Sequence, residues 1–393
     1  MKIILCKAGT LAAAKKEYYK VADSYIQQQY ELKLKALNKE KADYQSEKNS
    51  LREEKDRLQK QLDEMAEEFI RVNLDDATEI ERKAITLFKE GKIDESIKLR
   101  ESLKSGIEYK NAVIRKSKED AIIIFHIRNL QALAKDYLLK FDFKNAELKY
   151  EELASGDSAN FDNNFALVNF LYHQNQHDKA IKYCQIALKL AKSEPDRANT
   201  QNNLGILYKD KNEYPAALNA YLKAVEIRER LAKTNPATYE PDIATTQNNL
   251  GNLYQAKNEY PAALNAYSKA LEIYERLAKT NPATYEPYVA MTQNNLRVLY
   301  QAKSEYAAAL NAYSKALEIR EHLAKTNPAT YEPYVAGTQN NLGTLYKDKN
   351  EYPAALNAYS KALEIRERLA KTNPAIYEPD VAMIQNILGG VLC

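Results

Sequence analysis

The second half of this 393-residue chain repeats one pattern of apolar and polar positions at a fixed interval. The pentapeptide Gln-Asn-Asn-Leu-Gly begins at Gln201, Gln247 and Gln339, and a copy beginning at Gln293 has Arg297 in place of the glycine. An altered copy closes the series. The leucine of the tag recurs every 46 residues, at Leu204, Leu250, Leu296, Leu342 and Leu388. Self-similarity at a period of about 20–50 residues is typical of a solenoid, in which one supersecondary unit is stacked on the next. Solenoids usually supply binding surfaces.

Each 46-residue unit predicts two helices joined by a short turn. In the second copy we expect the first helix over about residues 241–256 and the second over about residues 261–280. Proline stands at the first position of several second helices, where its missing N–H removes no helical hydrogen bond. These prolines are Pro215, Pro261 and Pro353. Residues 235–241 are expected to form the loop between units, its first proline ending one helix and its second starting the next.

Small and large apolar residues follow fixed spacings in both helices. Leu250 and Gly251 precede Tyr254 in the first helix, and Ala263 precedes Tyr267 in the second. This set resembles the tetratricopeptide repeat (TPR), in which small residues let two helices approach and large ones fill the space between them. The resemblance covers roughly residues 80–393 and implies an all-α, right-handed superhelical solenoid of antiparallel helix pairs. The 46-residue step is similar to that of the extended repeats of the kinesin light chain group. The resemblance implies this repeat subtype and does not extend to the motor association of that group.

Arg297 departs from this resemblance, because it stands where the close-packed glycine belongs. We expect it either to splay the third unit locally or to turn its side chain outward.

The first half of the chain has a different pattern. Residues 1–11 predict a short strand or a disordered end, and residues 12–74 predict one long charged helix without proline or glycine. Residues 75–195 predict diverged helical hairpins, with Gly91 in the turn of one of them, and the regular array occupies residues 196–393. The predicted fold is therefore the TPR solenoid preceded by a long N-terminal helix or coiled coil.

Two heptad seams run along this predicted N-terminal helix. One is apolar from Leu37 through Leu51 and Leu58, whereas the other is cationic in its middle, with Lys48 and Lys55 among its members. Apolar seams predict a coiled coil, here a homodimer through residues 30–70, but successive lysines would face like charges in a parallel dimer. A single charged helix, or one folded back on the array, is the alternative.

Composition narrows the classes of partner. The formal net charge is only +3, from 57 basic and 54 acidic residues, which gives no reason to expect nucleic acid. No apolar run approaches the roughly 18 residues of a membrane span, and the start of the chain lacks a signal-peptide apolar region. Three scattered cysteines, Cys6, Cys184 and Cys393, fit a reducing compartment better than a disulfide framework. We therefore expect a cytoplasmic protein without a membrane span.

Because the units are near-identical copies, the positions that differ between them are the informative ones. One position of the first helix differs at Ile206, Asn252, Val298 and Thr344, and another differs seven residues earlier. A third difference follows at Lys209, Gln255, Gln301 and Lys347. These positions share one helix face, and they match the positions that line the concave groove in the TPR family. Drift on a solvent-facing stripe is the alternative, although the exposed face of the second helix varies less.

Paired asparagines lie between these variable positions. They are Asn202 and Asn203, Asn248 and Asn249, Asn294 and Asn295, and Asn340 and Asn341. Asparagine in a helix interior costs about 0.6 kcal/mol relative to alanine. An amide can bond the backbone of an extended peptide, and the resemblance implies such an asparagine ladder. The alternative is that one asparagine of each pair bonds a neighbouring helix and only holds the solenoid together.

The sequence contains no recognisable active site. His173 and His177 have a metal-capable spacing, but the sequence predicts a helix–helix turn there and offers no third ligand. We expect no metal, no cofactor and no catalysis. The predicted function is a protein-interaction scaffold that binds a protein or peptide segment in the groove, through the asparagine pairs and the variable residues named above. The alternative is a structural homo-oligomer assembled through the N-terminal coiled coil, with the array as a spacer.

Overall fold

The computed structural model describes residues 8–37, 44–70, 78–104, 120–372 and 374–392. Within these ranges the chain consists of helices, caps and turns, without a strand. The chain divides into two parts, residues 1–191 and residues 192–393, which are taken separately below. The all-α solenoid of antiparallel helix pairs that the sequence predicts is confirmed.

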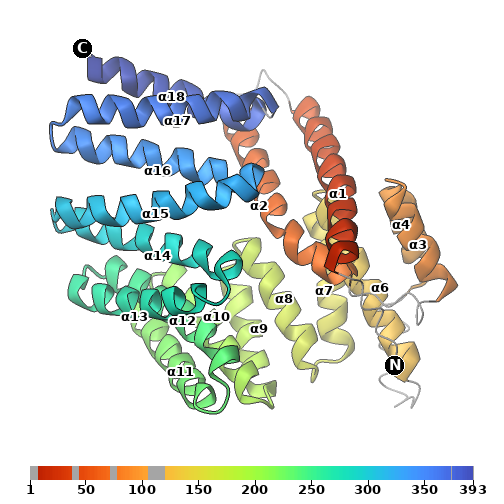
Figure 1. The fold of residues 1–393 in the computed structure, drawn as a ribbon. Helices are drawn as coiled ribbons and strands as arrows, with labels where there is room; N and C mark the ends of the chain where they lie inside the picture. Colours follow the sequence, from red (N-terminus) through yellow and green to blue (C-terminus); the bar gives the residue numbers. More distant parts are fainter. Residues whose placement is uncertain (1–7, 38–43, 71–77, 105–119, 373, 393) are drawn as a thin grey trace. The chain divides into compact units, whose positions relative to one another are not determined.

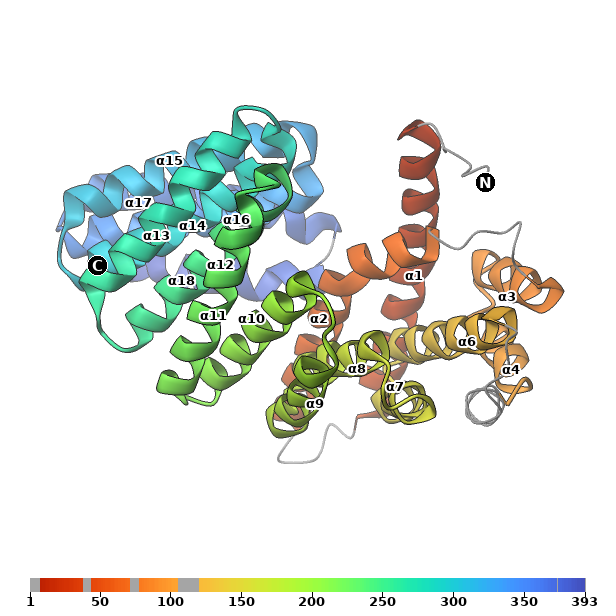
Figure 2. The same ribbon diagram turned by 90° about the horizontal axis from the view of Figure 1, so that it is seen from below.

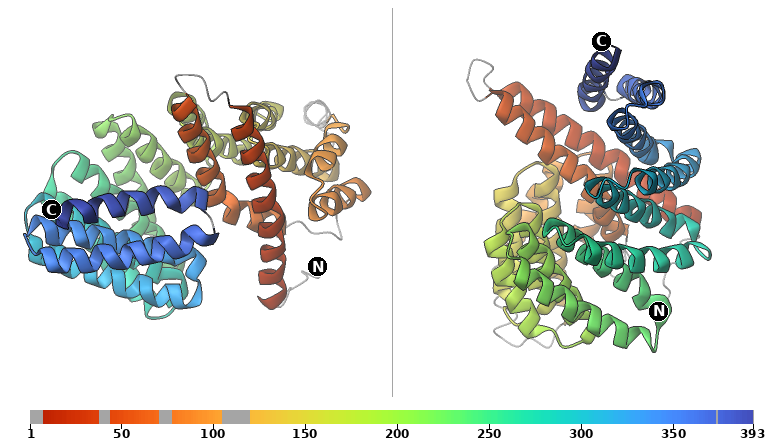
Figure 3. Two further views of the ribbon diagram at one scale, coloured as in Figure 1. Left: turned by 90° about the horizontal axis from the view of Figure 1, so that it is seen from above. Right: turned by 90° about the vertical axis from the view of Figure 1, so that its left-hand side faces the viewer.

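The N-terminal part begins with a helical hairpin. Helix α1 (Ala8–Ala36) lies antiparallel to α2 (Tyr44–Ile70), and the two run side by side in Figure 3. Gln59 Nε2 donates to Asp23 Oδ1 at 2.6 Å, while Lys55 Nζ lies 4.9 Å from the centroid of the Tyr30 ring. The stretch predicted as one long helix is thus two helices.

The apolar seam predicted for a dimer is buried in the chain itself. Leu51 and Leu58 of this seam are buried, and in the other seam Leu62 is buried and Lys55 is buried against Tyr30. Packing of α2 on α1 therefore explains the heptad pattern without a second chain. The strand or disordered end predicted for residues 1–11 lies largely outside the described residues.

Further helical hairpins complete the N-terminal part (Figure 2). They pair α3 (Glu79–Lys89) with α4 (Ile93–Glu101), α6 (Asp120–Leu139) with α7 (Phe143–Gly156), and α8 (Phe161–His173) with α9 (His177–Leu190). The predicted turn at Gly91 is confirmed: its φ of 76° suits glycine, which adopts the left-handed region without strain.

The C-terminal part is a regular stack in which each helix packs on the next (Figure 1). The first helices are α10 (Glu194–Asp210), α12 (Pro236–Ala256), α14 (Pro282–Ala302), α16 (Pro328–Asp348) and α18 (Pro374–Leu392). The second helices are α11 (Tyr214–Ala232), α13 (Tyr260–Ala278), α15 (Tyr306–Thr326) and α17 (Tyr352–Thr372). We number the pairs α10–α11, α12–α13, α14–α15 and α16–α17 as repeats 1 to 4.

A tyrosine from each second helix fills the core of its repeat. Tyr267 is fully buried, and a Cβ added to Gly251 of the facing first helix would lie 2.4 Å from its ring. The glycine therefore permits the close approach of the two helices. Between the helices, Asn258 occupies the left-handed region at a φ of 59°, which asparagine tolerates better than most residues.

The first helices begin earlier than the sequence predicted. Helix α12 starts at Pro236, so the segment expected to be a loop up to Pro241 is largely its first turns. The Asn235 side chain accepts a hydrogen bond from the Thr238 N–H and caps the helix, and Pro236 follows at a first-turn position where proline is favoured. The prediction that Pro241 starts the helix was wrong, because the capping asparagine precedes the first proline.

Candidate functional site

The candidate site is the face of the first helices that carries the paired asparagines and the variable positions. Asn202 and Asn248 are buried, whereas their counterparts Asn294 and Asn340 are half-buried. The second asparagines are half-buried as well: Asn203, Asn249, Asn295 and Asn341. The two variable positions are half-buried in repeats 1 to 3 and exposed in repeat 4. The half-buried residues are Ile206, Asn252, Val298, Lys209, Gln255 and Gln301, and the exposed ones are Thr344 and Lys347.

The asparagine pairs form rungs between consecutive first helices. Asn249 Nδ2 donates to Asn202 Oδ1 at 3.2 Å, and Asn295 Nδ2 donates to Asn248 Oδ1 at 3.0 Å. The first asparagine of one repeat thus accepts from the second asparagine of the next. These bonds partly offset the low helix propensity of asparagine, so at least one amide of each such rung stabilises the solenoid.

In repeats 3 and 4 the first asparagine has no hydrogen bond of this kind among those that the structure shows. Asn294 Oδ1 accepts from Arg297 Nε at 3.2 Å. Asn340 Oδ1 is buried without a hydrogen-bond partner among the described residues. The position that should donate to it is Ile387, because the last copy of the tag has isoleucine in place of the second asparagine. The ladder is therefore complete only at the start of the array.

Tyrosine hydroxyls from the second helices reach the variable positions. Tyr267 Oη donates to Asn252 Oδ1 at 2.6 Å and to Gln255 Oε1 at 3.1 Å. In repeat 4 the Tyr359 and Thr344 hydroxyls lie 3.1 Å apart. Burial raises the pKa of Tyr267, so its hydroxyl stays a neutral donor. The variable residues thus surround a constant polar group that reaches the surface of the first helix.

Arg297 fills the place of the close-packed glycine without pointing straight into solvent. Its guanidinium carbon lies 4.8 Å from the centroid of the Tyr313 ring, and its Nη1 donates to Tyr313 Oη at 2.8 Å and to Gln301 Oε1 at 3.2 Å. Burial lowers the pKa of Arg297, but arginine remains charged at neutral pH. The side chain lies along the tyrosine ring, and its charge stays among the candidate site residues.

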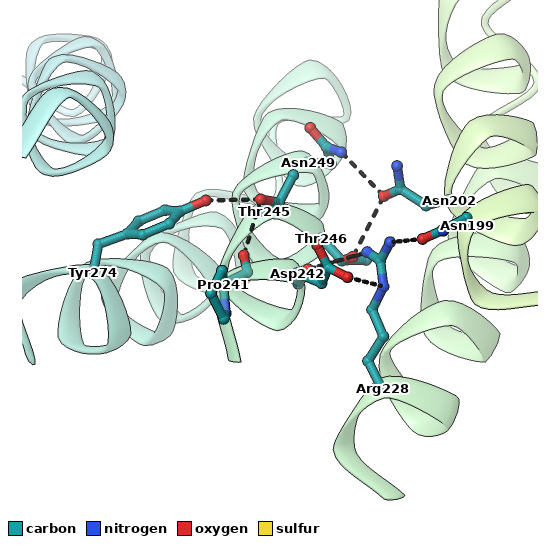
Figure 4. Close-up of polar contacts among 9 residues, drawn as sticks. All are labelled: Asn199, Asn202, Arg228, Pro241, Asp242, Thr245, Thr246, Asn249 and Tyr274. Carbon is teal, nitrogen blue, oxygen red and sulfur yellow. Dashed lines mark hydrogen bonds and ion pairs between the residues drawn. The ribbon is translucent and has the colours of Figure 1, made fainter. Parts of the chain in front are cut away.

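Asn199 occupies the other variable position of the first helix, seven residues before Ile206. It takes part in a polar network around Arg228 (Figure 4). Arg228 is buried, and its Nη2 donates to Asn199 Oδ1 at 2.8 Å while its Nη1 donates to the Asp242 carbonyl at 3.0 Å and to Thr246 Oγ1. Thr246 Oγ1 in turn donates to Asn202 Oδ1 at 3.4 Å. Repeats 1 and 2 are therefore linked through Arg228 and the first rung of the ladder.

Differences at the Arg228 position are matched by differences at the Asp242 position of the next repeat. Where arginine is replaced by Tyr274, the next repeat has Tyr288, and their rings stack with centroids 5.1 Å apart. Arg320 lies 5.6 Å from the centroid of the Tyr334 ring, and an Arg366 nitrogen lies 3.4 Å from an Asp380 carboxylate oxygen. Each pair joins the second helix of one repeat to the first helix of the next, so this variation is explained by packing between repeats.

The sequence interpretation missed two sets of residues. Tyr267 and its equivalents were assigned to packing alone, although tyrosine rather than phenylalanine at a buried position indicates a used hydroxyl. Arg228 was missed entirely. The paired change from Arg228 and Asp242 to Tyr274 and Tyr288 could have revealed it, had the copies been compared two positions at a time.

The described residues contain no group of three side chains that could hold a metal ion. His173 ends α8 and His177 begins α9, at the predicted turn. In the part of the chain that the structure describes, each helix is too short or too polar to cross a membrane.

The repeats also match known protein families. Two family models, both described as tetratricopeptide repeat, match the chain, one over residues 157–230 and 242–322 and the other over residues 335–374. No curated protein matches the chain in sequence.

Several solved structures are similar to the chain. Apo RapI is 16% identical with a TM-score of 0.49, covering 73% of this chain and 75% of its own. The Cut9–Hcn1 hetero-tetramer of the APC/C is 16% identical with a TM-score of 0.46, covering 96% and 69%. The nearly identical TPR-like repeats of a protein named putative kinesin light chain, from Podosopora anserina, are 20% identical with a TM-score of 0.40, covering 55% of this chain and 97% of their own.

Proposed function

Because the chain belongs to the tetratricopeptide-repeat family, we propose that it is a non-catalytic scaffold that binds a segment of another protein along its first helices. The segment is an extended peptide or an amphipathic helix, and it lies across the asparagine pairs and the variable residues between them. Solenoids of this kind present extended surfaces, each repeat contributing a similar patch.

One observation carries this proposal. Variation at the Arg228 position is matched by a changed partner inside the array, as in the Tyr274–Tyr288 stack. Variation at Ile206, Asn252 and Thr344 has no such internal counterpart, because the preceding glycine and the neighbouring second-helix tyrosine are the same in these three repeats. At Val298 the glycine is replaced by Arg297, which bonds the Tyr313 hydroxyl. A position that changes chemistry against a constant background, at the surface of one helix face, is best explained by a ligand.

The rival function, assembly through the N-terminal helices, has less support. The α2 residues that would form its seam are already buried, with Lys55 packed on Tyr30 of the same chain. Light scattering on the full chain gives the molar mass directly, and a dimer that resists dilution would revive this alternative.

Site-specific photocrosslinking tests the proposed function. Benzoylphenylalanine is placed in the full chain at Asn252 or Thr344 of the first helices, and at Leu222 or Lys315 of the second helices as matched controls. After irradiation in cells, mass spectrometry identifies the crosslinked proteins. We expect one partner to be crosslinked from the first-helix positions and not from the controls. Equal crosslinking from both sets would contradict the assignment.

A further inference from the structure

Helices α6 and α7 of the N-terminal part have the same relation to each other as the two helices of an array repeat. They repeat the spacing of Leu250, Tyr254, Ala263 and Tyr267 with Leu133, Tyr137, Ala146 and Tyr150. Phe141 in the turn between them has a φ of 57°, and Asn258 in the turn of repeat 2 has a φ of 59°. Helix α6 is therefore the first helix of a TPR-like hairpin, and its first-helix face can be located by residue number.

Two further helices pack on α6. Helix α7 is its own second helix, and α4 is the second helix of the preceding hairpin. Helices α1 and α2 also contact α6, and α1 contacts α3, the first helix of the preceding hairpin. The Arg57 guanidinium of α2 donates to the His173 carbonyl at the end of α8, which is a first helix as well. The α1–α2 hairpin thus lies on the first helices of the N-terminal part.

The first-helix face of α6 has the residues of a covered surface. Leu138 is buried, and it stands at a position that is polar in each array repeat, where the residues are Lys209, Gln255, Gln301 and Lys347. Lys135 stands at the position of Ile206, and burial of its ammonium group lowers its pKa to about 8. Since α4 and α7 take the places that second helices take around a first helix of the array, the cover on this face is α1 and α2.

One side of α1 docks on the N-terminal hairpins. The Tyr18 ring stacks on the Phe88 ring of α3, with centroids 5.1 Å apart. Tyr25 lies about two turns later on the same side, and Ala22 between them is fully buried. Burial raises the pKa of both tyrosines, and the charge of Asp136 on α6 raises it further. Two tyrosines with a small residue between them therefore face the first helices.

The other side of α1 faces α2. Lys55 Nζ of α2 lies 4.9 Å from the centroid of the Tyr30 ring, and Asp23 of α1 accepts from Gln59 of α2. The two helices pack on each other over a long stretch (Figure 3), whereas α1 touches α3 and α6 over a short one. Because the less extensive contact opens first, the hairpin can separate from the first helices while α1 stays on α2.

We propose that the α1–α2 hairpin is an internal ligand of the N-terminal hairpins: it covers their first-helix face and leaves as a unit when a partner helix competes for that face. The partner presents two tyrosines about two turns apart with a small residue between them, as Tyr18, Ala22 and Tyr25 do in α1. Because the face is free in only a fraction of the molecules, the cover lowers the apparent affinity for the partner. This site is separate from the array, so its failure would leave the proposed function of the array intact.

Thiol labelling tests whether the hairpin leaves as a unit. Tyr18→Cys and Tyr30→Cys are introduced one at a time into the full chain carrying Cys6→Ser and Cys393→Ser. Both tyrosines are 4% exposed on the same helix, one against α3 and the other against α2, so the variants are matched. Cys184, buried in α9, is the internal reference for unfolding of the N-terminal part. N-Ethylmaleimide at pH 7, followed by mass spectrometry of tryptic peptides, gives the rate at each thiol.

We expect the thiol at position 18 to react at least tenfold faster than the thiol at position 30 and than Cys184. Equal rates at positions 18 and 30 would mean that α1 unfolds rather than leaves with α2. A rate at position 18 no faster than that of Cys184 would mean that the hairpin is a fixed part of the core. Either result would overturn the proposal.

A labelled copy of α1 tests whether the uncovered face binds a helix. A fluorescein-labelled peptide of residues 8–36 is titrated by fluorescence anisotropy against the full-length wild type and against full-length Tyr18→Ala, whose own α1 lacks the stack on Phe88. The same peptide carrying Tyr18→Ala is the matched control, and an unreactive Cys184 shows that the N-terminal part of the variant stays folded.

We expect the peptide to bind the Tyr18→Ala protein at least tenfold more tightly than the wild type, and the control peptide to lose this binding. Equal affinity for both proteins, absence of binding to the variant, or equal binding of the control peptide would each refute the internal-ligand assignment.

Discussion

Replacing the first asparagine of the pair by alanine in two different repeats measures how much the hydrogen bond between asparagines of neighbouring first helices stabilises the array. Asn248 and Asn340 occupy the same position of the repeat. Asn248 Oδ1 accepts from Asn295 Nδ2 at 3.0 Å, whereas Asn340 Oδ1 is buried without a partner among the described residues, since the sequence has Ile387 at the position of the donor. The two substitutions remove the same atoms from the same helix position, so their difference isolates the rung.

The expected magnitudes follow from this geometry. Asparagine to alanine in a helix interior gains about 0.6 kcal/mol in both variants. Asn248→Ala also loses a hydrogen bond worth about 1 kcal/mol, and somewhat more because the site is buried. Asn340→Ala instead removes an unsatisfied buried acceptor, which costs about 1–3 kcal/mol when left unpaired. We therefore expect Asn340→Ala to stabilise the array and Asn248→Ala to destabilise it slightly, with a difference of about 2–4 kcal/mol.

Urea unfolding of the full chain, followed by circular dichroism, measures the difference as a shift of midpoint at constant slope. Ile387→Asn, which restores the missing donor, is the reciprocal control: in that background the advantage of Asn340→Ala should shrink. Equal midpoints for Asn248→Ala and Asn340→Ala would refute the assignment of the rungs.

Three further predictions concern single positions. Gly251→Ala should lower the melting temperature in a thermal melt, because its Cβ would lie 2.4 Å from the Tyr267 ring, whereas Gly337→Ala should raise it by removing a helical glycine from open space. Burial raises the pKa of the Cys184 thiol to about 12, so iodoacetamide at pH 8 should alkylate it in urea and leave it unmodified in the folded protein, as mass spectrometry would show. Burial raises the pKa of Asp136 from 3.8 to about 6, so the folded state binds a proton in that window that the unfolded state does not. The stability of the N-terminal part should therefore fall, by about 3 kcal/mol, as pH rises through this window, and the urea midpoint of Asp136→Asn should lack this fall.

The repeat architecture was predictable because its signals are local and repeated. The recurrence of Leu250 with its glycine and asparagines fixes the period, and the proline at the start of the second helices marks one boundary of each unit. The start of the first helices was predicted too late, since the choice between Pro236 and Pro241 depends on whether Asn235 caps the helix. Capping depends on the backbone conformation of Asn235, which the positions of the prolines in the sequence do not reveal.

The packing of one helix on another could not be predicted from the residue at each position alone. Residues 12–74 predict helix throughout, and only the packing of Lys55 on Tyr30 shows that the chain folds back between α1 and α2. The sequence placed the asparagine pairs on the candidate face but left open whether they bind a ligand or a neighbouring helix. The rung from Asn249 to Asn202 depends on the offset between adjacent first helices, which the period alone does not specify.

Direct binding measurements on a matched pair of surface variants test the central claim, that the first helices form the binding face. Thr344 on a first helix and Leu222 on a second helix are both exposed, and each is replaced by glutamate in the full chain. The partner segment identified by crosslinking is titrated against both variants by fluorescence anisotropy, with melting temperatures measured in parallel. We predict that Thr344→Glu weakens binding at least tenfold at an unchanged melting temperature and that Leu222→Glu binds like the wild type. The reverse result, or equal affinity for both variants, would contradict the account.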